Sequence, residues 1–222
     1  MISDAVADVP LREEPASARA YRALERMIVT LELPPGSVAT EGSLITRLGL
    51  GRTPVREAIQ RLAWEGLVDV RPRAGLGIAP LHGGDWVKVI DARRGAEVVL
   101  ARSAARFVTH EAAALFRDAA LAMQKAVVTG NVIAFLEADK QLDAAMAVAS
   151  DNPFAAQLVA PLQTHSRRFW YRYQSDTGLA DAAAGHLGII RAVTEGDVEG
   201  AGAAMGSLMD LLRANAEAVM RA

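Results

Sequence analysis

Hydrophobic residues recur every three to four positions over most of the chain, and this spacing predicts helices. In the first third, the pattern predicts a helix over 17–33, which the Leu33-Pro34-Pro35-Gly36 segment ends. A second, short helix is expected over 40–48. A third is expected to begin at Thr53-Pro54, a cap residue followed by a first-turn proline, and to end near residue 66.

The pattern then changes from helical spacing to alternation. Residues 67–71 alternate apolar and polar side chains, which predicts a strand, and 76–78 can return as a second strand after a turn over 71–75. The first 80 residues are therefore predicted as three helices followed by a hairpin.

From residue 85 onwards only helical spacing remains. Short breaks such as Gly130-Asn131, Asp151-Asn152-Pro153 and Asp176-Thr177-Gly178 separate the segments. The predicted helices are 85–107, 110–129, 131–149, 153–174, 180–195 and 197–221. The expected fold is mainly α, with a winged helix-turn-helix domain over 1–80 and an all-helical bundle over 85–222.

Composition narrows the class of protein. The chain contains 44 alanines and no cysteine, which favours helices and excludes disulfides and zinc fingers. No apolar run approaches the roughly 18 residues of a membrane span, and the start lacks the basic segment of a secretory signal. We expect a cytoplasmic protein without a membrane anchor.

The net charge of −2 conceals a basic segment. Residues 42–73 contain six arginines and three acidic residues, and Arg52 and Arg56 lie at the start of the third predicted helix. Cations there oppose the helix dipole, whereas a helix that presents its N-terminus to DNA requires them. A helix-turn-helix with a wing and this charge pattern predicts DNA binding.

Residues 21–78 resemble the N-terminal domain of GntR-family transcription regulators. The matching residues are Leu33-Pro34-Pro35-Gly36, Glu41, Leu44, Leu48-Gly49, Arg52-Thr53-Pro54-Val55-Arg56-Glu57-Ala58, Arg61-Leu62, Glu65-Gly66-Leu67-Val68 and Pro72-Arg73-Ala74-Gly75. The resemblance implies a homodimer that binds a palindromic double-stranded operator. It also implies DNA contacts from Arg47, Arg52, Thr53, Arg56 and, in the wing, Arg73 and Gly75. Gly51 and Gly42 replace polar residues that are usual in the family.

The remainder resembles the FCD ligand-binding domain of the FadR-like subfamily. The resemblance rests on Arg93 with Glu97, Asp139 with Asp143, Asp151-Asn152-Pro153 and the segment 186–205. It implies an effector pocket that binds a small organic acid, in which one Asp and three His hold a divalent metal. Asp139 and His186 match that set, but Asp143 and Leu208 occupy the positions of the other two histidines.

The residues themselves also point to a pocket. Asp139 and Asp143 are one helical step of four apart on an inward face, so their negative charges need a nearby cation. That cation could be zinc or a manganese-like ion held by Asp139, Asp143 and His186, or it could be Arg93 or a protonated His186. We expect Arg93, Asp139, Asp143 and His186 to line an effector site. We interpret the Arg167-Arg168 pair as flanking its helix rather than lining the pocket.

The sequence thus predicts a ligand-responsive, DNA-binding transcription regulator, a repressor rather than an enzyme. One alternative is a metal-dependent helical hydrolase fused to a DNA-binding domain, although no H-E-x-x-H motif or phosphate-binding glycine loop is present. The other is a constitutive regulator whose sensor pocket has decayed, as the missing histidines would allow.

Overall fold

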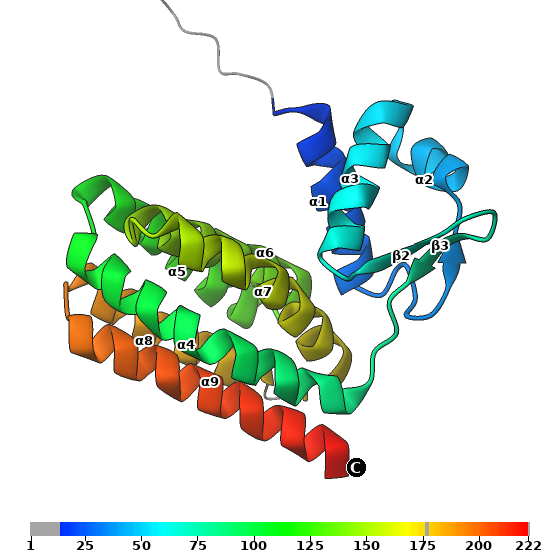
Figure 1. Cartoon of the computed structure of the whole chain (residues 1–222). Helices are drawn as coiled ribbons and strands as arrows, with labels where there is room; N and C mark the ends of the chain where they lie inside the picture. Colours follow the sequence, from blue (N-terminus) through cyan, green and yellow to red (C-terminus); the bar gives the residue numbers. More distant parts are fainter. Residues whose placement is uncertain (1–13, 176–177, 222) are drawn as a thin grey trace, which may run out of the picture.

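A small N-terminal lobe joins a larger bundle of helices in the computed structural model, which describes residues 14–175 and 178–221 (Figure 1). Residues 1–13 of the predicted first domain, the predicted break at Asp176-Thr177 and Ala222 lie outside the described residues. The mainly α architecture, with a winged helix-turn-helix followed by an all-helical bundle, confirms the predicted fold class. None of the described helices is long and apolar enough to span a bilayer.

The N-terminal lobe has a core of its own. Leu24 and Ile28 of its first helix pack with Val55, Ile59 and Leu62 of its third. The elements of this lobe are α1 (Ala16–Val29), β1 (Val38–Ala39), α2 (Glu41–Leu48), α3 (Arg52–Trp64), β2 (Val68–Arg71) and β3 (Gly75–Ile78).

Helix α1 ends four residues before the predicted boundary. Leu31 has a left-handed backbone with φ of 60°. The Leu33 N–H donates to the Met27 carbonyl oxygen at 2.9 Å, which closes the last turn. The residue before a proline disfavours helical geometry, and here that residue is Leu33 before Pro34.

The two helices of the helix-turn-helix are set by their ends. Thr40 caps α2 by accepting from the Ser43 N–H, and Gly49 ends it with φ of 62°. Helix α3 begins at Arg52, one residue before the predicted cap at Thr53, and Gly51 takes the N-cap position. Pro54 therefore lies in the third position, which a helix tolerates because N–H groups of the first turn have no intrahelical acceptor.

The wing is a three-stranded antiparallel sheet in the order β1-β3-β2. Strand β1 was not predicted, since two residues are too few to show alternation. Gly75 has φ of 91°, and a Cβ atom there would lie 2.7 Å from the Ala39 carbonyl oxygen. A glycine at this position is therefore what allows β1 and β3 to pair.

The C-terminal bundle packs around a core in which alanine allows close helix approach. Ala101, Ala104, Ala119 and Ala138 are fully buried in it. In Figure 1, α4 and α9 run side by side along one face of the bundle. The helices are α4 (Gly83–Phe107), α5 (His110–Val128), α6 (Val132–Ala149), α7 (Pro153–Tyr173), α8 (Gly178–Thr194) and α9 (Val198–Arg221).

Candidate functional site

Of the predicted DNA-contact residues, those outside the wing lie at the start of α3 and at the end of α2. Arg52 and Thr53 occupy the first turn of α3, and Arg56 follows one turn later. The side chains of Arg52 and Arg56 are 73% and 56% exposed, and Arg47 is exposed at the end of α2. These four side chains are thus available to DNA, and the three on α3 lie near a helix N-terminus, where phosphates are also favoured.

Glu41 holds two of these arginines in place. Its carboxylate accepts from Arg56 Nε with both oxygens at 2.8 Å, and Arg52 Nε lies 3.9 Å from the same group. Glu41 belongs to the motif that identified this domain, but its pairing with the two arginines could not be predicted from the sequence. Because the pairs are exposed, a phosphate can replace the carboxylate at little cost.

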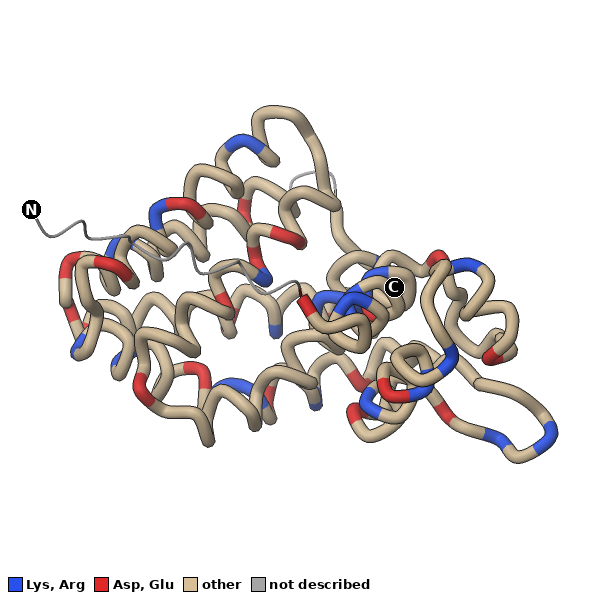
Figure 2. The backbone as a smooth tube through the Cα atoms, turned by 90° about the horizontal axis from the view of Figure 1, so that it is seen from above, with Lys and Arg blue, Asp and Glu red and all other residues tan. Residues whose placement is uncertain are grey.

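Two further arginines of the basic segment differ in their surroundings, because Arg73 lies in the wing and Arg61 lies on α3. Figure 2 shows basic positions in the loop between β2 and β3, where Arg73 has a left-handed backbone with φ of 65° beside Gly75. Arg61, which the sequence placed on the basic face, is turned to the bundle side instead. It stacks over the Tyr21 ring at 3.7 Å and donates to Glu65 at 2.9 Å.

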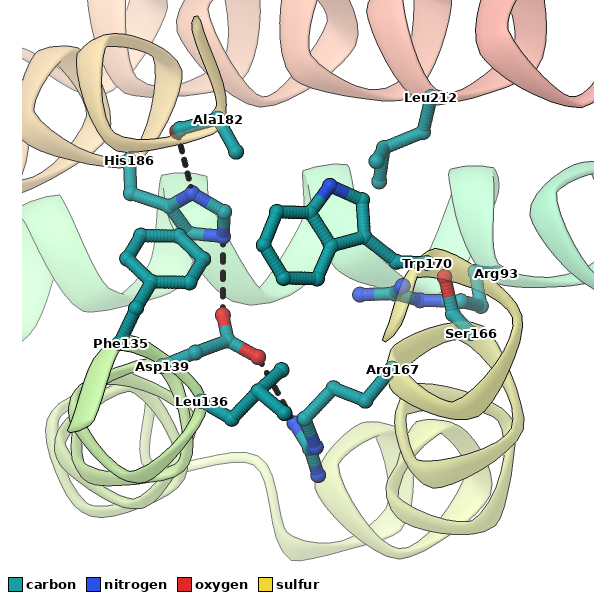
Figure 3. Close-up of a pocket in the computed structure, with 10 residues that line it drawn as sticks. All are labelled: Arg93, Phe135, Leu136, Asp139, Ser166, Arg167, Trp170, Ala182, His186 and Leu212. Carbon is teal, nitrogen blue, oxygen red and sulfur yellow. Dashed lines mark hydrogen bonds and ion pairs between the residues drawn. The ribbon is translucent and has the colours of Figure 1, made fainter. Parts of the chain in front are cut away.

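A small pocket lies among the helices of the bundle (Figure 3). Side chains from α4, α6, α7, α8 and α9 converge on it, and charged, polar and apolar groups alternate around it. The lining residues are Arg93, Phe135, Leu136, Asp139, Ser166, Arg167, Trp170, Ala182, His186 and Leu212.

His186 donates from both ring nitrogens. Nδ1 lies 2.6 Å from the Ala182 carbonyl oxygen, and Nε2 lies 2.9 Å from Asp139 Oδ1. Both partners only accept, so the imidazolium form satisfies both contacts. Burial acts to lower the pKa of His186, but the hydrogen bond and charge of Asp139 outweigh it and hold that pKa above its usual value.

Arg167 is the cation that the two carboxylates share. Its Nη1 lies 3.1 Å from Asp139 Oδ2 and also pairs with Asp143 Oδ2. Our interpretation of Arg167-Arg168 as a flanking pair was wrong, because Arg167 lines the pocket and Arg168 is fully buried. The sequence could not reveal this, since α6 and α7 meet only in the folded chain.

The pKa values of the two acidic partners of Arg167 are shifted in opposite directions. Burial acts to raise the pKa of Asp139, yet the hydrogen bond and charge of His186, with Arg167, keep it below the usual range. Burial, foremost, and then the charge of Asp139 raise the pKa of Asp143 to about 7, against the effect of Arg167. Asp139 is thus the fixed anion of the pocket, and Asp143 is the weaker acid behind Arg167.

Arg93 reaches the pocket from α4 while remaining bonded to Glu97. Its Nε and Nη2 lie 3.0 and 2.7 Å from Glu97 Oε1, which also accepts from Gln163 at 3.1 Å. Of the four predicted effector-site residues, the structure brings Arg93, Asp139 and His186 to the pocket lining. Asp143 lies one contact further out, through Arg167. Ser166 and Trp170 were missed, although both share the inward face of α7 with Arg167.

The predicted metal ligands do not form a metal site. The guanidinium of Arg167 already bridges Asp139 and Asp143, and His186 has no free ring nitrogen. Within the described ranges, no three His, Asp or Glu side chains are arranged to hold an ion. The donor set therefore does not fit the resident metal that the family resemblance implied.

Helix α7 also joins the bundle to the N-terminal lobe. Thr164 donates to Glu25 of α1 at 2.8 Å, and Lys140 of α6 pairs with the same carboxylate. His165 Nε2 donates to the Glu65 carbonyl at 2.8 Å, and Arg168 Nη2 donates to the Ala79 carbonyl at 2.6 Å. The residues that dock the lobe alternate along α7 with the residues that line the pocket.

Comparison with known proteins identifies a family for the N-terminal lobe and another for the helical bundle. Residues 16–78 match the profile of bacterial regulatory proteins of the gntR family, and residues 88–211 match the FCD domain. The chain is 30% identical over 167 residues to the protein named "Probable D-xylose utilization operon transcriptional repressor" of Paenarthrobacter nicotinovorans, an alignment that covers 75% of this chain and 74% of that protein. It is 33% identical over 101 residues to the HTH-type transcriptional repressor RspR of Escherichia coli K12, covering 43% of this chain and 42% of RspR.

Solved structures agree on the fold. McbR/YncC of E. coli superposes with a TM-score of 0.79 at 18% identity, over 93% of this chain and 99% of that one. A GntR regulator from Rhodococcus sp. RHA1 superposes with a TM-score of 0.71 at 19% identity, over 91% of this chain and 97% of that one.

Proposed function

We propose a function from the family to which this chain belongs, the GntR family of bacterial regulatory proteins with an FCD domain. It is a DNA-binding transcription regulator, not an enzyme. We infer further that it is a repressor whose hold on its operator is controlled by a small organic acid bound in the bundle pocket.

The DNA-bound form is a homodimer on a palindromic operator. One winged helix presents only one exposed recognition helix, and two such helices related by a twofold axis match two half-sites about one helical turn apart. Arg52, Thr53 and Arg56 would contact the major groove or its phosphates, and Arg73 with Gly75 would approach the minor groove.

The pocket chemistry supports a monocarboxylic acid with a compact apolar body. Arg93, Arg167 and Ser166 offer donors at one end, and Phe135 and Trp170 supply an apolar wall. The observation that carries the proposal is that Arg167 Nε is buried and has no acceptor within the described residues. A buried donor without an acceptor is costly, and a ligand carboxylate would remove that cost.

Helix α7 supports a route from the pocket to the DNA-binding lobe. Ser166, Arg167 and Trp170 line the pocket, while Thr164 and Arg168 bond to the lobe from the same two turns. A ligand that binds one placement of α7 more tightly than another shifts the placement of both winged helices, and so weakens binding to a fixed half-site spacing.

The test is DNA binding with a panel of organic acids. Fluorescence anisotropy with the protein's own promoter region should show salt-sensitive, sequence-selective binding. One or more monocarboxylic acids should weaken that binding and raise the Tm of the protein.

A pocket-filling variant supplies the control. Ala182 lines the pocket, so Ala182→Leu should abolish the acid response and leave DNA binding intact. Ala184→Leu, at an exposed position of the same helix, should respond as the natural protein does. Unchanged DNA binding with every acid would favour a constitutive regulator, and an acid response that survives Ala182→Leu would place the ligand elsewhere.

A further inference from the structure

Two buried carboxylates of α6 share one protein cation. Asp139 and Asp143 lie one turn apart with side chains 13% and 20% exposed, and Arg167, at 9%, contacts both. Two like charges at this depth require a cation between them. Arg167 Nη1 supplies it at 3.1 Å from Asp139 and in direct contact with Asp143.

His186 cannot also serve a metal in this arrangement. Its Nδ1 donates to the Ala182 carbonyl and its Nε2 donates to Asp139, so neither nitrogen presents a lone pair. A metal would have to displace the proton that binds His186 to Asp139.

Leu208 occupies a position at which the family resemblance implies a metal-binding histidine, and its side chain is hydrocarbon. It is buried on α9 and packs against α8 beside His186, where a Cβ atom on Gly185 would lie 3.0 Å from Leu208 Cδ1. Leu208 therefore packs hydrocarbon closely against α8 at this level and offers no metal-ligating atom.

We propose that the guanidinium of Arg167 takes the place of a metal ion, so that this sensor recognises its ligand without metal. This inference rests on the ligand pocket proposed above. A fixed guanidinium holds a carboxylate by directed hydrogen bonds, and Arg167 Nε is the donor left for the ligand. Replacing Arg167 with an uncharged residue should therefore create a site that metal ions stabilise, which the natural protein lacks.

The first measurement uses the natural protein, without DNA or ligand. Elemental analysis after purification in chelator-free buffer should find far less than one metal ion per protomer. EDTA, Mn²⁺ and Zn²⁺ should each leave its Tm unchanged within about 1 °C, since no binding contributes to stability. Stoichiometric metal, or a Tm that falls with EDTA and recovers with metal, would overturn the proposal.

The second measurement removes the cation. Arg167→Met leaves Asp143 without its cation and leaves Asp139 with His186 alone, so the Tm should fall by about 5 °C or more. Mn²⁺ or Zn²⁺ should then restore at least about half of the loss. Arg172→Met, at an exposed arginine five residues further along α7, should change neither property. A folded Arg167→Met protein with no metal response would contradict the proposal.

A variant that fails to fold does not remove the test, because the metal content and EDTA response of the natural protein decide the question independently. Neither measurement uses an acid ligand or an operator. An acid screen that finds nothing would therefore refute the proposed effector while leaving this inference standing, and the reverse also holds.

Discussion

Arg56 illustrates how an internal partner prepares a residue for DNA. Both oxygens of Glu41 accept from its Nε at 2.8 Å, which fixes the guanidinium at the surface of the recognition helix before DNA arrives. Arg61, one and a half turns later on the same helix, is fixed by Tyr21 and Glu65 against the bundle side. The partner, rather than the residue type, decides which arginine is available to DNA.

Arg56→Ala should therefore weaken binding to the operator by about 10- to 100-fold, because it removes a charged contact to a base or phosphate. The free energy of unfolding of the Arg56→Ala variant should differ from that of the natural protein by no more than about 0.5 kcal/mol, since the side chain is exposed. Anisotropy titrations at two salt concentrations and urea unfolding measure both quantities.

The matched control is Arg191→Ala, which removes one exposed positive charge from α8. It should bind the operator as the natural protein does. Equal losses in the two variants would mean that Arg56 acts through net charge alone and makes no contact of its own.

At the scale of elements, helices were predictable and the details of the wing were not. The six bundle helices lie within two residues of their predicted bounds, because periodic burial and Gly or Asn breaks act locally. Strand β1 was missed because Val38–Ala39 becomes a strand only by pairing with Leu76 and Gly77. The start of α3 was misplaced because a proline fits the third position of a helix as well as the first.

Gly75 is the wing residue that a substitution should test. Gly75→Ala adds a Cβ atom 2.7 Å from the Ala39 carbonyl oxygen at φ of 91°, so it should destabilise the N-terminal lobe by about 1 to 3 kcal/mol. Urea unfolding gives this value, and DNA binding should weaken as the wing shifts.

Gly42→Ala provides the opposite expectation in the same lobe. The glycine lies inside α2 with no neighbour within 4 Å of an added Cβ atom. The substitution should be neutral or stabilise by up to about 1 kcal/mol, because alanine favours helix. A destabilisation by Gly42→Ala as large as that by Gly75→Ala would show that backbone conformation is not the cause.

At the scale of the whole molecule, the sequence revealed the parts of the pocket but not their connection. Arg93, Asp139 and His186 were found because each lies on the inward face of its own helix. Arg167 was missed because its role depends on contacts with α6, and Thr164 was missed because its partner, Glu25, is 139 residues away. Contacts between helices decide which of several inward polar residues form one site.

His165 tests the junction between the lobe and the bundle. Its Nε2 donates to the Glu65 carbonyl at 2.8 Å, with Arg168 and Glu65 as its charged neighbours. Burial, foremost, and Arg168 hold the pKa of His165 below its usual value, against the opposing effects of Glu65. The folded protein therefore keeps this ring neutral where the unfolded chain binds a proton.

Because the unfolded chain takes up that proton near pH 6.5, this contribution to stability is complete above pH 6.5 and is lost as the pH falls below it. His165→Gln keeps an N–H donor for the Glu65 carbonyl and cannot titrate, so this loss should disappear. Urea unfolding from pH 8 to pH 5 should show the natural protein losing stability relative to the variant.

The difference between the two proteins isolates His165, since His186 titrates with the opposite sign in both. A raised pKa makes His186 stabilising at low pH, and that term is lost as the pH rises. A stability difference that is constant with pH, or that favours the natural protein at pH 5, would show that the junction does not depend on a neutral His165.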